Sequence, residues 1–538
     1  MPLALCAIGA RAAGTQQPDW ELLEREMNAS RRSESGYGYD EAGESGVAAG
    51  AGRVSSEAEH EPETGHEPEA GREPRDAEVP TAATGGPMRG AMDASYGSLS
   101  EGAARLFRLA SLRPWWHVTP GAAAAAAGVP EDAASALLAE LADARLLEAP
   151  GDRGGGSCQV RYRFHDVWRQ YAEQRALTHD GIAGAAAAVR RTLLWYVRAA
   201  AAADACVLPG RWHLGPAYTR LAGRPAAYEN GLSALAWLRG ERENLAEAVR
   251  AAADHGLDDL TWQLCETMWG LHLRLGFHQQ WVSTHRLGVE AAARCAEESP
   301  EAEGRMHAQL GFGYLGLAEY GQAQAQFEAA AAADRRAGHI RGEATAVESL
   351  GLLHLKQERW GHAAECFRSA RTLAQQVGDP RALALLEHHL GRSLQGMGRH
   401  EEAVTQLRHA LGLIRALPDP YNEARVLMSI GRTLVDAGRP EEADEPLGRA
   451  ASVMAAEGSV VQQADLAELR ADRASRAGDT AGEIRYLRAA LGFHERTGAP
   501  RTGAVRARLD RAEAVRQRAV DAEEGEEAQA PGRVNEEG

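Results

Sequence analysis

The chain has 538 residues, of which 44% are hydrophobic and 6% aromatic, and its 76 acidic and 59 basic side chains give a formal net charge of −17. A chain of this length and composition is expected to fold into several domains, and a collagen-like or wholly disordered protein is excluded. Lys356 is the only lysine, so the lysine-containing P-loop that binds nucleotide phosphates is excluded as well.

The negative charge is concentrated in two segments. Residues 34–80 contain thirteen acidic and three basic side chains, and residues 521–538 contain seven acidic and one basic side chain. Together they account for −16 of the net charge of −17. Because solvated segments carry almost all of this charge, it does not indicate whether the folded part binds anionic partners.

The sequence has no recognisable export or membrane signal. Residues 1–14 lack a basic start, and the apolar run before Arg11 is shorter than a signal peptide requires. No stretch reaches the roughly 20 apolar residues of a membrane-spanning helix. The six cysteines form no C-x-x-C pair, which argues against a zinc knuckle or a disulfide-rich secreted scaffold. We therefore expect a cytoplasmic protein without membrane contact.

Residues 34–88 are rich in Gly, Ser, Glu and Pro and are predicted to form a disordered acidic insert. The tetrapeptide His-Glu-Pro-Glu occurs twice in this insert, at His60 and at His66. Metal binding by these two histidines is the alternative to a solvated linker. We favour the linker, because two histidines alone do not make a closed metal site.

Residues 89–176 show the pattern of a winged helix. Three helices are predicted, at about 103–112, 120–127 and 131–144, and a glycine-rich turn then leads to an alternating strand at 158–164. Three helices followed by a β-hairpin with a glycine-rich tip are typical of this domain.

Winged helices often bind DNA, which makes a DNA-binding regulator an alternative function. Between Tyr96 and Arg175 the sequence has nine basic and nine acidic residues. A neutral domain lacks the positive surface that phosphate binding requires, so we do not expect DNA as a partner.

Residues 259–516 contain a 40-residue repeat. A Leu-Gly or Ile-Gly pair recurs four times, and the pattern Ala-x3-[Phe/Leu]-x2-Ala recurs in phase with it. Small residues where two helices meet, with a large apolar residue between them, are typical of the tetratricopeptide repeat, here with longer loops than in the usual unit of about 34 residues. The repeated positions are Leu310-Gly311, Leu350-Gly351, Leu390-Gly391 and Ile430-Gly431; Ala323, Ala363, Ala403 and Ala443; Phe327, Phe367, Leu407 and Leu447; and Ala330, Ala370, Ala410 and Ala450.

The predicted fold class is therefore mainly α, a winged-helix domain followed by an α-solenoid of tetratricopeptide repeats. Residues 177–258 are expected to form a helical connector between the two. Residues 517–538 are expected to form a disordered acidic tail.

The concave face of the solenoid is the predicted partner-binding surface. The residue after each repeated glycine is expected to point into the groove, whose lining passes from apolar to basic along the chain. We expect a protein or an extended peptide with an acidic end as the partner; alternatively, the arginines only solubilise an exposed helix face. The acidic tail is a candidate occupant in cis, and beyond Glu348 we expect no comparable acidic lining. The predicted partner-binding residues are Phe312, Leu352, His388, Arg392, Arg425 and Arg432.

Short motifs occur in the order typical of one family. Pro2-Leu3-Ala4-Leu5 lies at the start, Arg163-Phe164-His165-Asp166-Val167 follows the glycine-rich turn, and Glu241 with Asn244-Leu245 precedes the repeats. In this order they resemble the C-terminal part of bacterial STAND regulators of the NB-ARC, winged-helix and tetratricopeptide type, including the SARP-type regulators of actinobacteria. The resemblance implies that residues 1–33 are a remnant of the NB-ARC helical subdomain and that the P-loop ATPase core is lacking.

In this resemblance His165 corresponds to the histidine of the MHD motif, which faces the β-phosphate of ADP in the family. Without the P-loop lysine we expect His165 to be a vestigial cofactor position that binds neither ADP nor ATP. We expect Asp166 to be the N-cap of the helix that follows. The sequence contains no motif of an enzyme active site or metal centre, so we expect no catalytic residue, cofactor or metal.

The sequence thus favours a non-catalytic protein-interaction module of a truncated STAND-type regulatory protein that acts in signalling or transcription. A transcriptional regulator that binds DNA through the winged helix is one alternative. A nucleotide-switched regulator is the other, if NB-ARC sequence precedes Met1.

Overall fold

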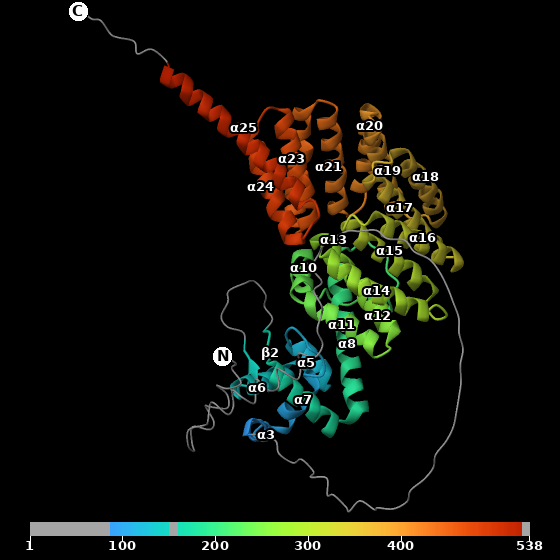
Figure 1. Ribbon diagram of the computed structural model, residues 1–538. Coiled ribbons are helices and arrows are strands. Elements are labelled where there is room, and N and C mark those ends of the chain that lie inside the picture. Colours follow the sequence, from blue (N-terminus) through green and yellow to red (C-terminus); the bar gives the residue numbers. More distant parts are fainter. Residues whose placement is uncertain (1–86, 150–159, 530–538) are drawn as a thin grey trace, which may run out of the picture.

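The computed structural model describes residues 87–149 and 160–529 (Figure 1). The described part is mainly helical, as predicted, and its strands form one two-stranded sheet. None of the described helices is long and apolar enough to cross a membrane. The predictions for residues 1–33, for nearly all of the acidic insert and for the glycine-rich turn lie outside the described residues.

The first helices of the described chain surround a small core of their own. The three helices predicted in this region are present, and Ser100 and Thr119 cap two of them by accepting hydrogen bonds from backbone N–H groups. β1 and β2 pair antiparallel, and Val118 forms a further antiparallel bridge with Tyr162. The elements are α3 (Pro87–Gly97), α4 (Glu101–Ala110), α5 (Pro120–Ala127), α6 (Glu131–Asp143), β1 (Leu147–Glu148) and β2 (Arg163–Phe164).

A long helix, α8, joins this region to the rest of the chain. It packs against α5 near one end and against α10 and α12 near the other (Figure 1). Its buried side chains, among them Leu193 and Tyr196, belong to one hydrophobic cluster that reaches from α5 to α15. The core is therefore continuous across the predicted boundary at residue 258. The elements of this part are α7 (Asp166–His179), α8 (Gly181–Val207), α9 (Pro216–Thr219), α10 (Gly231–Gly240) and α11 (Arg242–Asp254).

The repeats form pairs of antiparallel helices, A and B, stacked into a solenoid. In the four repeats predicted from the sequence, the Leu-Gly or Ile-Gly pair lies on helix A and the Ala-x3-[Phe/Leu]-x2-Ala pattern on the B segment. The helices are α12 (Asp258–Thr267), α13 (Trp269–Leu275), α14 (His278–Arg294), α15 (Pro300–Gly316), α16 (Tyr320–Arg336), α17 (Ile340–Lys356), α18 (Trp360–Val377), α19 (Pro380–Gly396), α20 (His400–Arg415), α21 (Pro420–Asp436), the 3₁₀ turn η1 (Pro440–Ala443), α22 (Asp444–Ala456), α23 (Val460–Arg476), α24 (Thr480–Thr497) and α25 (Thr502–Gln529).

The repeated residues hold the two helices of each pair together. Ala363, Phe367 and Ala370 are completely buried, and so are the equivalent residues of the neighbouring repeats within 2%. A Cβ atom added at Gly351 would lie 2.5 Å from Cε1 of Phe367, closer than real Cβ contacts allow. The glycine is therefore required because helix A lies directly against the large apolar side chain of helix B.

The chain beyond the last repeat differs from the prediction. The tail expected to be disordered from residue 517 is helical through Gln529, because α25 continues without a break. Its sequence is rich in Ala, Glu and Arg, which are strong helix formers even without packing. Figure 1 shows α25 leading away from the solenoid, so the described tail does not enter the concave face.

The solenoid curves back onto the connector, and Arg274 of α13 lies at the point of return. Its guanidinium carbon lies 3.5 Å from the ring centroid of Tyr421. One nitrogen lies 2.8 Å from the carboxylate of Glu457, and the same nitrogen donates to the carbonyl of Val207 at 3.2 Å. With its side chain 1% exposed, Arg274 fixes the C-terminal repeats against α8 and α13.

Candidate functional site

The A helices line the inner side of the solenoid. Successive A helices contact one another more closely than successive B helices do. An array of helix pairs in which one set is closer together curves with that set inside. The residues predicted to bind a partner lie on α15, α17, α19 and α21, which are A helices of this concave side.

The apolar end of the predicted surface is partly covered by the chain itself. The ring centroid of Phe312 lies 5.2 Å from that of Trp269 on α13 and 5.2 Å from that of Phe327. Leu352 is half-buried and packs against the core of the next repeat. Both side chains therefore act mainly in packing, and α13 covers much of the Phe312 ring.

His388 does not line the groove as predicted, because the neighbouring A helix covers it. Its side chain is 1% exposed, and Nε2 lies 2.8 Å from Oγ of Ser429 on α21. Nε2 of the adjacent His389 lies 3.2 Å from Oε1 of Glu348. Burial lowers the pKa of both histidines well below the usual range, so both are neutral at pH 7. A partner on the concave face does not reach His388.

Arg392 is the predicted residue with the most unusual environment. It is half-buried on α19, and within the described part of the chain it makes no hydrogen bond or ion pair. Burial, together with repulsion from Arg425 and Arg432, lowers the pKa of Arg392 to about 10, and the carboxylate of Asp465 acts in the opposite direction. Arg425 itself donates to Oδ1 of Asn422 at 2.9 Å. Two guanidinium groups thus face one region of the concave surface, and one of them, Arg392, has no direct ion-pair partner among the described residues.

Arg432 differs from Arg392, since it already has an acidic partner. Its Nη1 lies 2.6 Å from Oδ2 of Asp472 on α23, which also pairs with Arg508. The expectation of no acidic lining beyond Glu348 is therefore wrong. Asp472 lies 40 residues after Arg432, so continuing the repeat by one more unit would have found this pair.

Glu348 lies on the same face, one repeat before His388. Burial raises the pKa of this carboxyl to about 7, and Arg381 and Arg425 act in the opposite direction. The concave face around α19 therefore combines a carboxyl group that is easily protonated with a guanidinium group that lacks a partner. Such a surface favours an incoming anion over an incoming cation.

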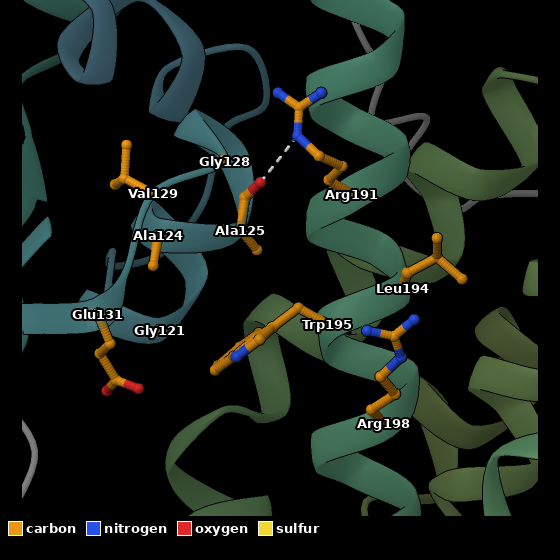
Figure 2. A pocket seen from close by; sticks show the side chains of 10 residues that line it. All are labelled: Gly121, Ala124, Ala125, Gly128, Val129, Glu131, Arg191, Leu194, Trp195 and Arg198. Carbon is orange, nitrogen blue, oxygen red and sulfur yellow. Dashed lines mark hydrogen bonds between the residues drawn. The ribbon is translucent and has the colours of Figure 1, made fainter. Parts of the chain in front are cut away.

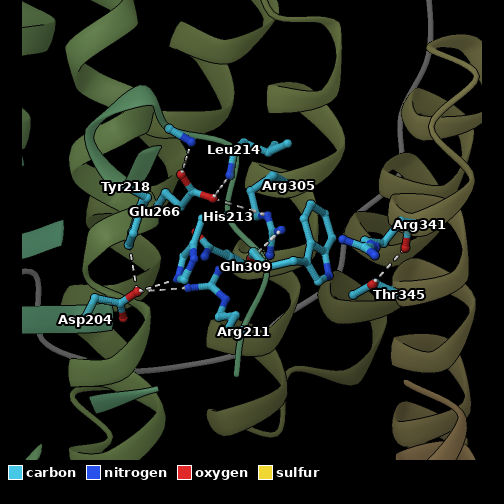
Figure 3. A network of polar contacts seen from close by, with 12 residues as sticks. Asp204, Arg211, His213, Leu214, Tyr218, Glu266, Arg305, Gln309, Arg341 and Thr345 are labelled. Carbon is cyan, nitrogen blue, oxygen red and sulfur yellow. Dashed lines mark hydrogen bonds and ion pairs between the residues drawn. The ribbon is translucent and has the colours of Figure 1, made fainter. Parts of the chain in front are cut away.

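Sequence reasoning missed a segment that crosses this face. Residues 208–215, called the strap below, link α8 to α9 and contact α12, α15, α17 and α19 (Figure 3). They lie in the predicted connector, and neither their hydropathy nor their composition signals a contact with repeats about 100 to 170 residues away. Long-range contact of an irregular segment leaves no periodic pattern to detect.

The motif Glu241 with Asn244 forms the joint between the first described helices and the connector. Oε1 of Glu241 lies 2.6 Å from Nε2 of His117. Asn244 donates to the His117 carbonyl and to Glu241, both at 2.9 Å, and accepts from the N–H of Trp116 at 2.8 Å. Glu241 and Asn244 are completely buried. These residues of the motif therefore have a structural role in this chain.

His165, the predicted vestigial cofactor position, lies where β2 meets α7. Its Nε2 is 3.2 Å from Oε1 of Glu148 on β1. The helix begins at Asp166, and His165 rather than Asp166 occupies the N-cap position, without a side-chain capping bond. The predicted N-cap is thus wrong by one residue, because Asp166 already has helical geometry.

An open cavity of about 440 Å³ lies between α5 and α8. Figure 2 shows Trp195 and Arg191 of α8 directed toward α5. Nε of Arg191 donates to the carbonyl of Ala125 at 3.0 Å, which satisfies the C-terminal end of α5. The cavity is a seam between packed helices. Among the described residues, no group of three or more His, Cys, Asp or Glu side chains is placed to hold a metal ion.

Comparison with known proteins agrees with the repeats. The tetratricopeptide repeat family matches residues 382–456. Regulatory protein AfsR of Streptomyces coelicolor is 33% identical over 224 residues, which cover 39% of this chain and 21% of that protein. The chain thus spans about a fifth of the length of this relative. The chain contains tetratricopeptide repeats and is similar to a regulatory protein.

Solved structures of low identity share the helical architecture. A STAND protein with a tetratricopeptide repeat sensor from Pyrococcus horikoshii is 13% identical, with a TM-score of 0.35, and the match covers 81% of this chain and 63% of that chain. The apo form of RapI is 12% identical, with a TM-score of 0.40, and covers 48% of this chain and 95% of that chain. Likenesses at these TM-scores do not bear on function.

Proposed function

We propose that the chain is the interaction part of a STAND-type regulatory protein, and that the concave face of its repeats binds an extended peptide with an acidic group at Arg392. The observation that carries this proposal is the half-buried guanidinium of Arg392, which forms no ion pair or hydrogen bond among the described residues, faces Arg425, and has the carboxylate of Asp465 only as a more distant attraction. An incoming carboxylate supplies the missing charge. A hydrogen bond between charged groups of this kind contributes about 1.5 to 3 kcal/mol.

The proposal gives the first described domain a structural role. The order helix, bridge strand at Val118, two helices, β1 and β2 supports a winged-helix arrangement for residues 89–176. The buried joint at Glu241 fixes this domain to the connector rather than leaving it free to follow DNA. Its balanced charge supports the same view.

The proposed function is non-catalytic and needs no nucleotide. The carboxylate of Glu148 lies 3.2 Å from Nε2 of His165. This carboxylate repels a phosphate that approaches His165, so the environment of His165 does not favour a phosphate.

The test uses a synthetic, fluorophore-labelled peptide of residues 518–538 as the acidic probe and a chain that ends at residue 517. Fluorescence anisotropy is expected to show binding that weakens about tenfold or more in Arg392→Glu, since charge reversal removes one charge-assisted contact. Arg408→Glu, an exposed change on helix B of the same repeat, is the matched control and should bind like the parent. Equal binding by all three chains would contradict the proposal.

A further inference from the structure

The strap, residues 208–215, lies on the solenoid as an extended peptide would. Pro209 and Gly210 share a cavity with Arg381 on α19 and Tyr421 on α21. Trp212 contacts α15 and α17, and Leu214 contacts α12. The strap thus passes the A helices one after another, in the reverse of their order in the chain.

The ring of Trp212 has its own binding position. The guanidinium carbon of Arg305 lies 3.5 Å from the ring centroid, and that of Arg341 lies 5.9 Å from it. The ring of His339 stands edge-on to the indole, at 5.2 Å between centroids. Cation–π and edge contacts of this kind select an aromatic side chain.

The backbone of the strap is bound as well. The completely buried carboxylate of Glu266 accepts hydrogen bonds from the N–H groups of Leu214 and Gly215, at 2.9 and 2.8 Å (Figure 3). Nη2 of Arg305 donates to the carbonyl of Trp212 at 3.3 Å. Backbone groups can be supplied by any extended peptide, whereas the indole of Trp212 and the side chains of Arg211 and His213, which both pair with Asp204, are specific to this sequence.

Both ends of the strap are buried, at Leu208 and Gly215, whereas its middle lies nearer the surface. Residues 211–214 are all half-buried, and Pro209 and Gly210 are exposed. Between α9 and α10, residues 220–230 are exposed or half-exposed and form turns. This segment lets the strap and the short helix α9 move together without unfolding α8 or α10, at the expense of the core contacts of Leu208 and Ala217.

We propose that the strap is a resident ligand of the solenoid, and that the track beneath it binds an extended partner peptide with a tryptophan followed, two and three residues later, by free backbone N–H groups. The track consists of Glu266, Arg305, His339, Arg341 and Arg381. Apart from Glu266 at the C-terminal end of α12, it lies in the N-terminal parts of the A helices or just before them, about two to three helical turns from the row that contains Phe312 and Arg392. The two surfaces are separate, so this inference stands without the proposed acidic site.

The experiment supplies residues 207–216 as a fluorophore-labelled synthetic peptide and measures its binding to the full chain by anisotropy. In the wild-type chain the tethered strap competes at a high effective concentration. We expect binding at least about tenfold tighter to Trp212→Ala than to the wild type, because the variant strap no longer fills the indole position. The matched control is the same peptide with alanine at position 212, which should bind neither chain.

Two results would overturn the inference. Equal binding of the peptide to both chains would place its site elsewhere, and no binding to either would make the strap an ordinary structural linker. A second measurement does not depend on the variant. With saturating peptide, hydrogen exchange of amides 208–215 in the wild-type chain should become faster, and an unchanged rate would count against displacement. Arg392→Glu should leave this binding unchanged, which separates this test from that of the acidic site.

Discussion

Two polar clusters of this chain, at the joint around Glu241 and on the concave face around Arg392, use charge in opposite ways. At the joint, the carboxylate of Glu241 is completely buried and is contacted by His117, Asn244 and Tyr196. On the concave face, Arg392 is half-buried and unpaired within the described residues.

The difference shows which cluster serves the fold and which one is available to a partner. A buried charge with several hydrogen-bond partners stabilises only the arrangement that supplies them, and it has nothing left to offer a ligand. A guanidinium that is partly desolvated without a counter-ion is unfavourable in the free protein, and a bound anion relieves this cost. Mutations at the joint should therefore lower stability. Mutations at Arg392 should weaken binding of a partner and leave stability unchanged or slightly higher.

The largest effect is expected from breaking the joint. Glu241→Ala removes the common acceptor of His117 and Asn244 and leaves their buried polar groups unsatisfied. Removing one partner of a buried charged cluster costs about 3 to 5 kcal/mol. Urea unfolding should show this loss as a lower midpoint.

The control for the joint is Glu402→Ala. This carboxylate pairs with Arg399 on the surface of α20, where an ion pair contributes little to stability. If Glu241→Ala shifts the midpoint no more than Glu402→Ala does, the joint does not stabilise the fold as its buried hydrogen bonds indicate.

The second effect is a loss of stability in acid. Burial lowers the pKa of His285 to about 4, from an ordinary value of about 6.5 in the unfolded chain. As pH falls from 6.5 to 4, the unfolded state takes up a proton and the folded state does not, so stability falls by roughly 3 kcal/mol for this residue. Burial also lowers the pKa of His272, His388 and His389, which act in the same direction.

Two described carboxyl groups, Glu348 and Asp334, act in the opposite direction, because burial raises the pKa of both. Burial raises the pKa of Glu348 to about 7, so between pH 7 and about 4.5 its protonation in the folded state adds stability. Burial lowers the pKa of His278 to about 4 as well, so the buried histidines outweigh the two carboxyl groups, and unfolding midpoints measured at pH 7.5, 5.5 and 4.5 should decrease in that order. His285→Gln should flatten this dependence, and an unchanged slope would show that His285 is not the group that titrates.

The repeats illustrate what the sequence alone can predict. Ala363, Phe367 and Gly351 were placed correctly because they recur every 40 residues, and each recurrence reflects the same close approach of two helices. The three helices predicted in the first domain end within about two residues of the observed Glu101–Ala110, Pro120–Ala127 and Glu131–Asp143.

The site was less predictable, because its chemistry depends on contacts between distant segments. Periodicity placed Arg392 and His388 on the same helix face, but it did not show that α21 buries His388 or that Asp472 neutralises Arg432. The contact between Trp212 and Arg305 could not be predicted either, because 93 residues separate the pair. A pattern with a fixed period reports the neighbours within a repeat and not the segments that cross it.

The smallest effect on stability is expected from Arg392→Leu, which tests directly whether Arg392, unlike Glu241, serves binding rather than stability. The substitution removes a partly desolvated charge without leaving any partner unsatisfied, and it relieves the repulsion from Arg425. Replacing unfavourable buried charge by an apolar side chain of similar reach is often neutral or stabilising. The urea midpoint of Arg392→Leu should therefore equal or slightly exceed that of the parent, by up to about 1 kcal/mol, while binding of the acidic probe peptide falls. If the urea midpoint of Arg392→Leu falls as far as that of Glu241→Ala, Arg392 stabilises the solenoid, and both clusters have a structural role.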